Sequence, residues 1–126
     1  MKQIISIIIL LAVIITLDVI TITNTRETME LLSNNINDIK NNVETQDTKN
    51  IQSSIDELDK NWKKSIDKLS YYIEHNELDK VEVEIVTFKT DIKNEEYDEA
   101  IESMEIANFL LEHIKDKNQF NLKNIF

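Results

Sequence analysis

The chain has 126 residues, with 14 Lys and Arg, 24 Asp and Glu, a formal net charge of -10, and no glycine, proline or cysteine. The absence of glycine excludes Walker loops, dinucleotide fingerprints, nucleophile elbows and EF-hand loops, because each needs a backbone that only glycine tolerates. The absence of cysteine excludes disulfides, thiolate metal sites and a cysteine nucleophile. The negative charge argues against nucleic acid as a partner, since its binding needs neutralising lysines and arginines.

The same absences favour an all-α fold. Tight primed hairpin turns usually need glycine, and helices without proline run uninterrupted. A codon bias towards Ile, Asn, Lys, Asp and Glu explains the missing residues about as well as selection for helix does. The length allows one membrane segment and one small helical domain.

The N-terminal segment from Ile4 to Thr23 is almost continuously aliphatic and about 20 residues long, which is enough to cross a bilayer as a helix. An uncleaved signal-anchor, a cleaved secretory signal and a buried core helix are the three interpretations. Cleavage needs small residues at the −3 and −1 positions, and residues 21–25 match poorly. A core helix would have polar positions on one face, and this segment has almost none. We therefore expect a transmembrane signal-anchor over residues 1–23.

Asp18 is the one carboxylate within this segment. It lies within about two helical turns of the end, so an interfacial position is the ordinary interpretation, and contact with a partner's membrane helix is the functional one. Lys2 flanks the N-terminal side, whereas Arg26 on the other side neighbours Glu27 and Glu30. The positive-inside rule then favours a cytoplasmic N-terminus and an extracytoplasmic acidic domain.

Residues 24–115 are expected to form a small antiparallel helical bundle of stacked helical hairpins. Apolar residues recur there at steps of three and four, which places an apolar stripe on one face of each helix. The stripes comprise Leu32, Ile36, Ile39 and Val43; Ile51, Ile55, Leu58, Trp62, Ile66, Leu69 and Ile73; Val81, Ile85, Phe88 and Ile92; and Ala100, Met104, Ala107 and Leu111. Residues 81–85 also alternate like a strand, but a lone strand has no partner, so we favour helix.

Asparagine and aspartate are expected to set the helix boundaries. Asn24 with Glu27 reads as a capping box, unless the membrane helix simply continues through it. Asp47 predicts the N-cap of a second helix over residues 48–76, residues 76–79 open a third, and Asn94 separates it from a fourth over residues 96–115. Asparagine at these positions tolerates the left-handed conformation that glycine would otherwise adopt. The apolar residues of a tail over 116–126 are expected to pack back on the bundle; they are Leu122, Ile125 and Phe126.

The two histidines each follow a glutamate, in Glu74-His75 and Glu112-His113. If the second, third and fourth helices alternate in direction, both pairs lie at one end of the bundle, where two histidines and two carboxylates suit a divalent metal. The ordinary alternative is a histidine at a helix C-terminus, which contacts the last carbonyls and the helix dipole. Adjacent helical residues point about 100° apart, so neither dipeptide chelates by itself. We expect no metal or other cofactor, and keep these four residues as candidates.

Trp62 lies in the stripe of the second helix, so core packing is the ordinary expectation and an exposed aromatic anchor for a partner is the functional alternative. No serine lies in a nucleophile motif, and acidic pairs such as Glu95-Glu96 suit a solvated helix start. No enzyme class is indicated.

Several short motifs together resemble a known family. Trp62 precedes Glu74-His75-Asn76-Glu77-Leu78-Asp79 by about a dozen residues, Phe109-Leu110-Leu111-Glu112-His113-Ile114 follows, and the chain closes with Leu122-Lys123-Asn124-Ile125-Phe126. Together with the short Lys-led anchor, this pattern resembles the domain of unknown function 4363 family of small membrane-anchored helical proteins from spore-forming Gram-positive bacteria. The resemblance implies an accessory role beside other small membrane proteins, and it brings no functional residues with it.

These observations predict a non-enzymatic single-pass membrane protein. Its extracytoplasmic helical domain would be an interaction or accessory module for another envelope or integral membrane protein. A ligand- or divalent-metal-binding sensor domain and a structural homo-oligomer assembled through the apolar stripes are the alternatives.

Overall fold

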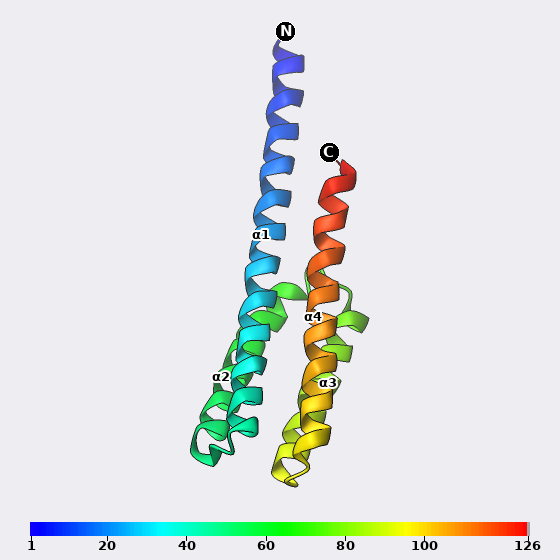
Figure 1. Cartoon of the computed structure of the whole chain (residues 1–126). Helices are drawn as coiled ribbons and strands as arrows, with labels where there is room; N and C mark the ends of the chain where they lie inside the picture. Colours follow the sequence, from blue (N-terminus) through cyan, green and yellow to red (C-terminus); the bar gives the residue numbers. More distant parts are fainter. Residues whose placement is uncertain (126) are drawn as a thin grey trace.

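The computed structural model describes the backbone of residues 1–125 and the side-chain surroundings of residues 1–119. Four helices follow one another: α1 over Lys2–Glu44, α2 over Thr48–Leu69, α3 over His75–Lys93 and α4 over Tyr97–Ile125 (Figure 1). Residues 1–125 contain no strand, so the expected all-α fold is confirmed, and residues 81–85 are helical.

Helix α1 runs without a break for 43 residues, so Asn24 does not cap a new helix. Its N-terminal end projects beyond the ends of the other three helices (Figure 1), and residues 1–20 are all exposed. Ser6, Thr16 and Thr21 each donate their hydroxyl hydrogen bond to the carbonyl four residues earlier, over 2.8–3.0 Å. This bonding satisfies the hydroxyl groups within the helix itself. The apolar segment is therefore not a core helix: it is long and apolar enough to cross a membrane, and no side chain among the described residues buries it.

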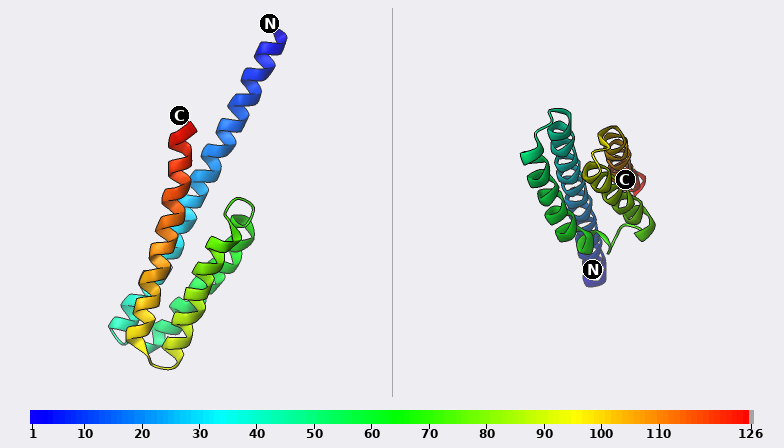
Figure 2. Two further views of the ribbon diagram at one scale, coloured as in Figure 1. Left: turned by 90° about the vertical axis from the view of Figure 1, so that its right-hand side faces the viewer. Right: turned by 90° about the horizontal axis from the view of Figure 1, so that it is seen from below.

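The bundle consists of two antiparallel hairpins, α1–α2 and α3–α4. Helices α1 and α4 lie side by side and join the hairpins, while α2 packs on α1 and α3 packs on α4. Helices α2 and α3 are not among the pairs that pack extensively, and the views along and across the bundle show them on the outer side of this α1–α4 layer (Figure 2). The fold is therefore a four-helix arrangement that leaves one of its helix–helix interfaces open.

The predicted apolar stripes form the core. Every stripe residue is buried except Ile66 and Ile92, which are partly buried and pack against it. Met29, Leu78 and Ile114 add to the core beyond the prediction. Three polar residues are also buried in it: Thr25, Asn35 and Ser103. The period of three and four residues predicted the buried face of each helix correctly.

The two turns at the far end of the bundle correct the expected role of asparagine. Gln46 and Glu95, with φ of 56° and 61°, hold the left-handed conformation, whereas Asn94 has φ of -87°. Each turn is a Schellman motif: the amide of Gln46 bonds to the carbonyl of Val43, and Glu95 bonds in the same way to Ile92. The left-handed residue of this motif comes one position after the C-cap, and Asn94 is itself the C-cap. Asn94 is therefore confirmed as the helix boundary, but not as the left-handed residue.

The boundary between α2 and α3 also differs from the prediction. Helix α2 ends at Leu69, not at residue 76, and α3 begins at His75. The amide of Ile73 still bonds to the carbonyl of Leu69 over 2.9 Å, which turns the chain so that both side chains are buried. Glu74, with ψ of 132°, then leaves the helical conformation. The predicted N-cap of α2 is confirmed, because the Asp47 carboxylate accepts a hydrogen bond from the Asn50 amide.

Helix α4 does not end at residue 115 but continues to Ile125, so most of the expected tail is helical. The expected packing of Leu122, Ile125 and Phe126 onto the bundle concerns side chains outside the described part of the chain.

Candidate interaction surfaces

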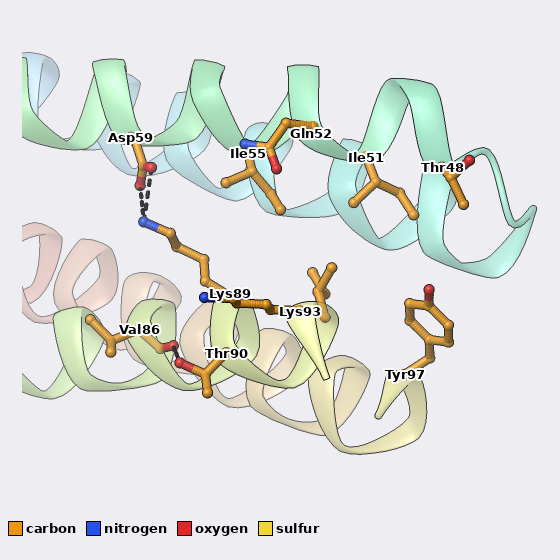
Figure 3. A pocket seen from close by; sticks show the side chains of 11 residues that line it. Thr48, Ile51, Gln52, Ile55, Asp59, Val86, Lys89, Thr90, Lys93 and Tyr97 are labelled. Carbon is orange, nitrogen blue, oxygen red and sulfur yellow. Dashed lines mark hydrogen bonds and ion pairs between the residues drawn. The ribbon is translucent and has the colours of Figure 1, made fainter. Parts of the chain in front are cut away.

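An open groove of about 750 Å³ lies between α2 and α3, where the bundle lacks a helix–helix interface (Figure 3). Helices α1 and α4 pass behind it. Its walls come from both outer helices and from the first residue of α4: Thr48, Ile51, Gln52, Ile55, Asp59, Val86, Lys89, Thr90, Ile92, Lys93 and Tyr97.

The groove has an apolar floor and a polar rim. Ile51 and Ile55 on α2 are buried, whereas Val86 on α3 is 57% exposed although it is a β-branched aliphatic residue. The Tyr97 ring stands at the end of the groove nearest the start of α2 (Figure 3). A concave surface with apolar side chains and a few polar groups is the usual form of a ligand or peptide site.

One ion pair crosses the groove. The Lys89 Nζ lies 2.9 Å from Oδ1 and 2.8 Å from Oδ2 of Asp59 (Figure 3). Both side chains are more than a third exposed, so solvent screens the pair and its contribution to stability is about 0–1 kcal/mol. Both residues line the groove, so the pair joins its two walls.

A second hollow, of about 590 Å³, lies at the far end of the bundle between the two turns. Its rim is strongly acidic, with Glu44, Glu95, Glu96, Asp98 and Glu99 around Tyr97 and Ile101. Both turns lie at the end opposite the N-terminus (Figure 1), so this acidic surface is the part of the domain farthest from the apolar segment.

The two Glu-His pairs lie at the same end of the bundle, as expected, because Lys117, one turn beyond His113, bridges to Glu74 over 3.8 Å. Neither histidine is at a helix C-terminus, however: His75 begins α3 and His113 lies within α4.

The glutamates of these pairs contact lysines, since Glu112 contacts Lys115 over 3.0 Å. His113 stacks on the Phe109 ring at a centroid distance of 6.5 Å. Among the described residues, no group of three or more His, Asp and Glu side chains is placed to hold a metal ion.

The lysines beside these glutamates have perturbed pKa values. The hydrogen bond from Lys117 to Glu77, 3.1 Å long, raises the lysine pKa, and the charge of Glu74 adds to the effect. The pKa of Lys115 is raised chiefly by its hydrogen bond to Glu112. The contacts of Lys117 with Glu74 and Glu77 link α4 to the start of α3, whereas the Lys115–Glu112 pair lies within α4.

Trp62 is 7% exposed and belongs to the core, so its ring is not an exposed anchor. Its Nε1 is buried with no hydrogen-bond partner among the described residues. Asp18 lies on the exposed part of α1, three residues before the first partly buried position, Thr21.

The groove is the feature that sequence reasoning missed. The signal was present in residues 81–86, where Val83 and Val86 fall outside the stripe of Val81, Ile85 and Phe88. Apolar residues in excess of one helical face indicate a second apolar surface. The structure places only Val86 of these two in the groove.

A family model described as Domain of unknown function (DUF4363) matches residues 19–125, which include all four helices except the first part of α1. No curated protein and no solved structure matches the chain.

Proposed function

The chain belongs to the family described as Domain of unknown function (DUF4363), and on that premise we propose that it is a non-enzymatic, single-pass membrane protein of a bacterial cell envelope. Its acidic helical domain lies outside the cytoplasm and binds another membrane protein. The observation that carries this proposal is the open α2–α3 groove in a bundle whose own apolar stripes are otherwise buried. The family match supports the resemblance drawn from the short motifs and assigns no activity.

The form of α1 supports the membrane anchor. Residues 1–20 are exposed and mostly aliphatic, and exposing so much apolar surface to water is unfavourable. A bilayer removes that cost. Because α1 continues without a break into the bundle, the anchor would hold the domain at a fixed orientation to the membrane.

The charges on either side of the apolar segment support an extracytoplasmic domain. Lys2 precedes the segment, and Arg26 after it is offset by Glu27 and Glu30. A C-terminal fusion to a phosphatase that is active only outside the cytoplasm should be active, and a fusion to a fluorescent protein that folds only inside should be dark. The opposite pattern would contradict this orientation.

The groove suits one amphipathic helix of a partner protein. Two helices with an apolar floor between them offer the cradle in which such a helix buries one face. The Lys93 side chain is exposed on the rim and has no ion pair among the described residues, so a carboxylate on the docked helix would complement it. Asp18 would be a second contact, to a membrane helix of the same partner.

Photo-crosslinking in intact membranes tests the groove. A photoreactive phenylalanine analogue is introduced at Val86, which lines the groove, and in a matched variant at Val83, which is 60% exposed on the same helix but lies outside it. We expect Val86 to capture one integral membrane protein and Val83 not to capture it. Lys93→Glu should abolish the capture. Equal capture from both positions would contradict a groove site.

The two alternatives have less support. A homo-oligomer held by the apolar stripes is disfavoured because those stripes pack within one chain. For the metal sensor, calorimetric titration of the full chain with zinc or manganese is the direct test of Glu74, His75, Glu112 and His113, and saturable heat that is lost on His75→Ala would favour it.

A further inference from the structure

Two tyrosines stand at the end of the bundle nearest the apolar segment. Tyr71 and Tyr72 lie in the connection between α2 and α3, and Tyr71 is 88% exposed, the most exposed aromatic side chain in the described part of the chain. Their neighbours Leu69 and Ile73 are 1% and 5% exposed. The connection is therefore anchored in the core on both sides, and it presents Tyr71 outward from a fixed position.

The antiparallel register of α1 and α2 indicates where these tyrosines lie along the axis of α1. Asn61 bonds to Asn35 over 2.7 Å, and Asn42 bonds to Ser54 over 3.2 Å. Both contacts fit one register, in which each step forward along α2 is a step back along α1. At the end of α2 this register sets Leu69 level with Glu27, so the connection that holds Tyr71 and Tyr72 begins about one helical turn from Thr23, where the apolar segment ends.

Helix α4 reaches at least as far towards the membrane. Its contacts with α1 are also antiparallel, since Lys40 contacts Glu105 over 3.3 Å and Asn37 contacts Asn108 over 3.0 Å. The C-terminal end of α4 lies beyond the α2–α3 connection, on the side of the N-terminus (Figure 1). Residues 117–126 contain two lysines and no Asp or Glu, although the chain as a whole has a net charge of -10. Acidic side chains are thus absent from the stretch of sequence that extends farthest.

We propose that the connection over residues 70–74 is a lipid-contacting element, with the Tyr71 and Tyr72 rings in the headgroup layer of the bilayer that α1 spans. Tyrosine favours this layer because its ring is apolar and its hydroxyl keeps hydrogen bonds to water and headgroups. The headgroup regions add about 10–15 Å to a hydrocarbon core of about 30 Å, so they extend several residues past the apolar run of α1. The bundle would then contact the membrane at two places, α1 and the connection over residues 70–74, and these two contacts would fix its orientation. The inference rests on the proposed membrane anchorage.

Spin labelling of the full chain in vesicles of phosphatidylcholine and phosphatidylglycerol tests this. The chain has no cysteine, so single cysteines at Ser70, Leu10 and Asp98 each carry one nitroxide. Collision with oxygen, which concentrates in lipid, is compared with collision with a water-soluble nickel chelate. We expect the Leu10 label to be protected from nickel, the Asp98 label at the far end to be fully accessible, and the Ser70 label to lie between them. The double substitution Tyr71→Ser and Tyr72→Ser should shift the Ser70 label to the Asp98 value, with unchanged helical circular dichroism.

Each other outcome has a distinct meaning. A Ser70 label as accessible as the Asp98 label, with Leu10 protected, overturns the lipid contact and leaves the anchor in place. A Ser70 label that stays protected after the double substitution overturns the role of the tyrosines. A Leu10 label open to nickel overturns the anchor itself, and the lipid contact with it.

Discussion

Asn61 on α2 donates a hydrogen bond of 2.7 Å from its Nδ2 to the Oδ1 of Asn35 on α1, and Asn35 is only 7% exposed. Its sequence neighbour Ile36 and the nearby Leu58 are fully buried aliphatic residues. A buried amide in such surroundings is unfavourable unless it is hydrogen-bonded. A shift of α2 along α1 would break this bond, so the pair favours one register, as a single buried asparagine does in coiled coils.

This pair predicts a coupled loss of stability. Asn35→Ala and Asn61→Ala should each lower the free energy of unfolding by about 1–2 kcal/mol, because each leaves a polar partner without its hydrogen bond. The double variant should lose less than the sum, since the second substitution removes the unpaired group. Urea unfolding of the full chain in detergent micelles, followed by circular dichroism, measures these values. Asn34→Ala, on the exposed side of α1, is the control and should change little.

The left-handed residues predict two stabilising substitutions. Gln46 and Glu95 hold φ of 56° and 61°, which costs a residue with a side chain about 1–2 kcal/mol relative to the right-handed conformation. Glycine avoids this cost but loses more conformational entropy on folding, so Gln46→Gly and Glu95→Gly should each raise the free energy of unfolding by up to about 1 kcal/mol. Thermal unfolding of the full chain checks the direction. Asn94→Gly, at φ of -87°, should be destabilising, and a gain there equal to that of Glu95→Gly would contradict the explanation.

The sequence was sufficient for the buried faces but not for the ends of the helices. A stripe such as Val81, Ile85 and Phe88 follows from helical periodicity alone, because burial of that face is the main source of stability for a short helix. The end of α2 at Leu69 depends on Ile73 reaching the core after a turn, which is a tertiary contact. Likewise, the sequence pattern does not show that Gln46 rather than an asparagine takes the left-handed conformation, since the hydrogen bonds of the turn decide it.

The groove could not be predicted from the sequence, for a similar reason. Its existence depends on which pairs of helices pack, and periodicity describes each helix separately. Ile51 and Ile55 belong to a predicted stripe, yet they also form a groove floor, because α3 does not close over them. Val83 and Val86 both fall outside the stripe of their helix, and the sequence does not show that only Val86 lines the groove.

We expect two substitutions of Trp62 to differ in their effect on the free energy of unfolding. Its ring fills part of the core, so Trp62→Ala should lower the free energy of unfolding by about 3–5 kcal/mol. Its Nε1 has no partner among the described residues, and burying such a group costs about 1–3 kcal/mol. Trp62→Phe removes that group and keeps most of the ring, so it should be nearly neutral. Urea unfolding compares the two, and a loss for Trp62→Phe as large as for Trp62→Ala would show that the indole itself is required.

We expect the pKa values of Lys117 and Lys115 to respond to different substitutions. The pKa of Lys117 is raised by its hydrogen bond to Glu77, and that of Lys115 by its bond to Glu112. A lysine whose pKa is raised on folding stabilises the folded state at pH below its unfolded value of 10.5, and this contribution is lost as the pH rises through the folded pKa. Glu77→Gln should therefore lower the pKa of Lys117 and leave that of Lys115 unchanged, whereas Glu112→Gln should do the reverse. Carbon NMR titration of the lysine Cε signals above pH 9 measures both, and a common shift of both lysines in either variant would show that the overall charge of the domain, and not the individual hydrogen bonds, sets their pKa values.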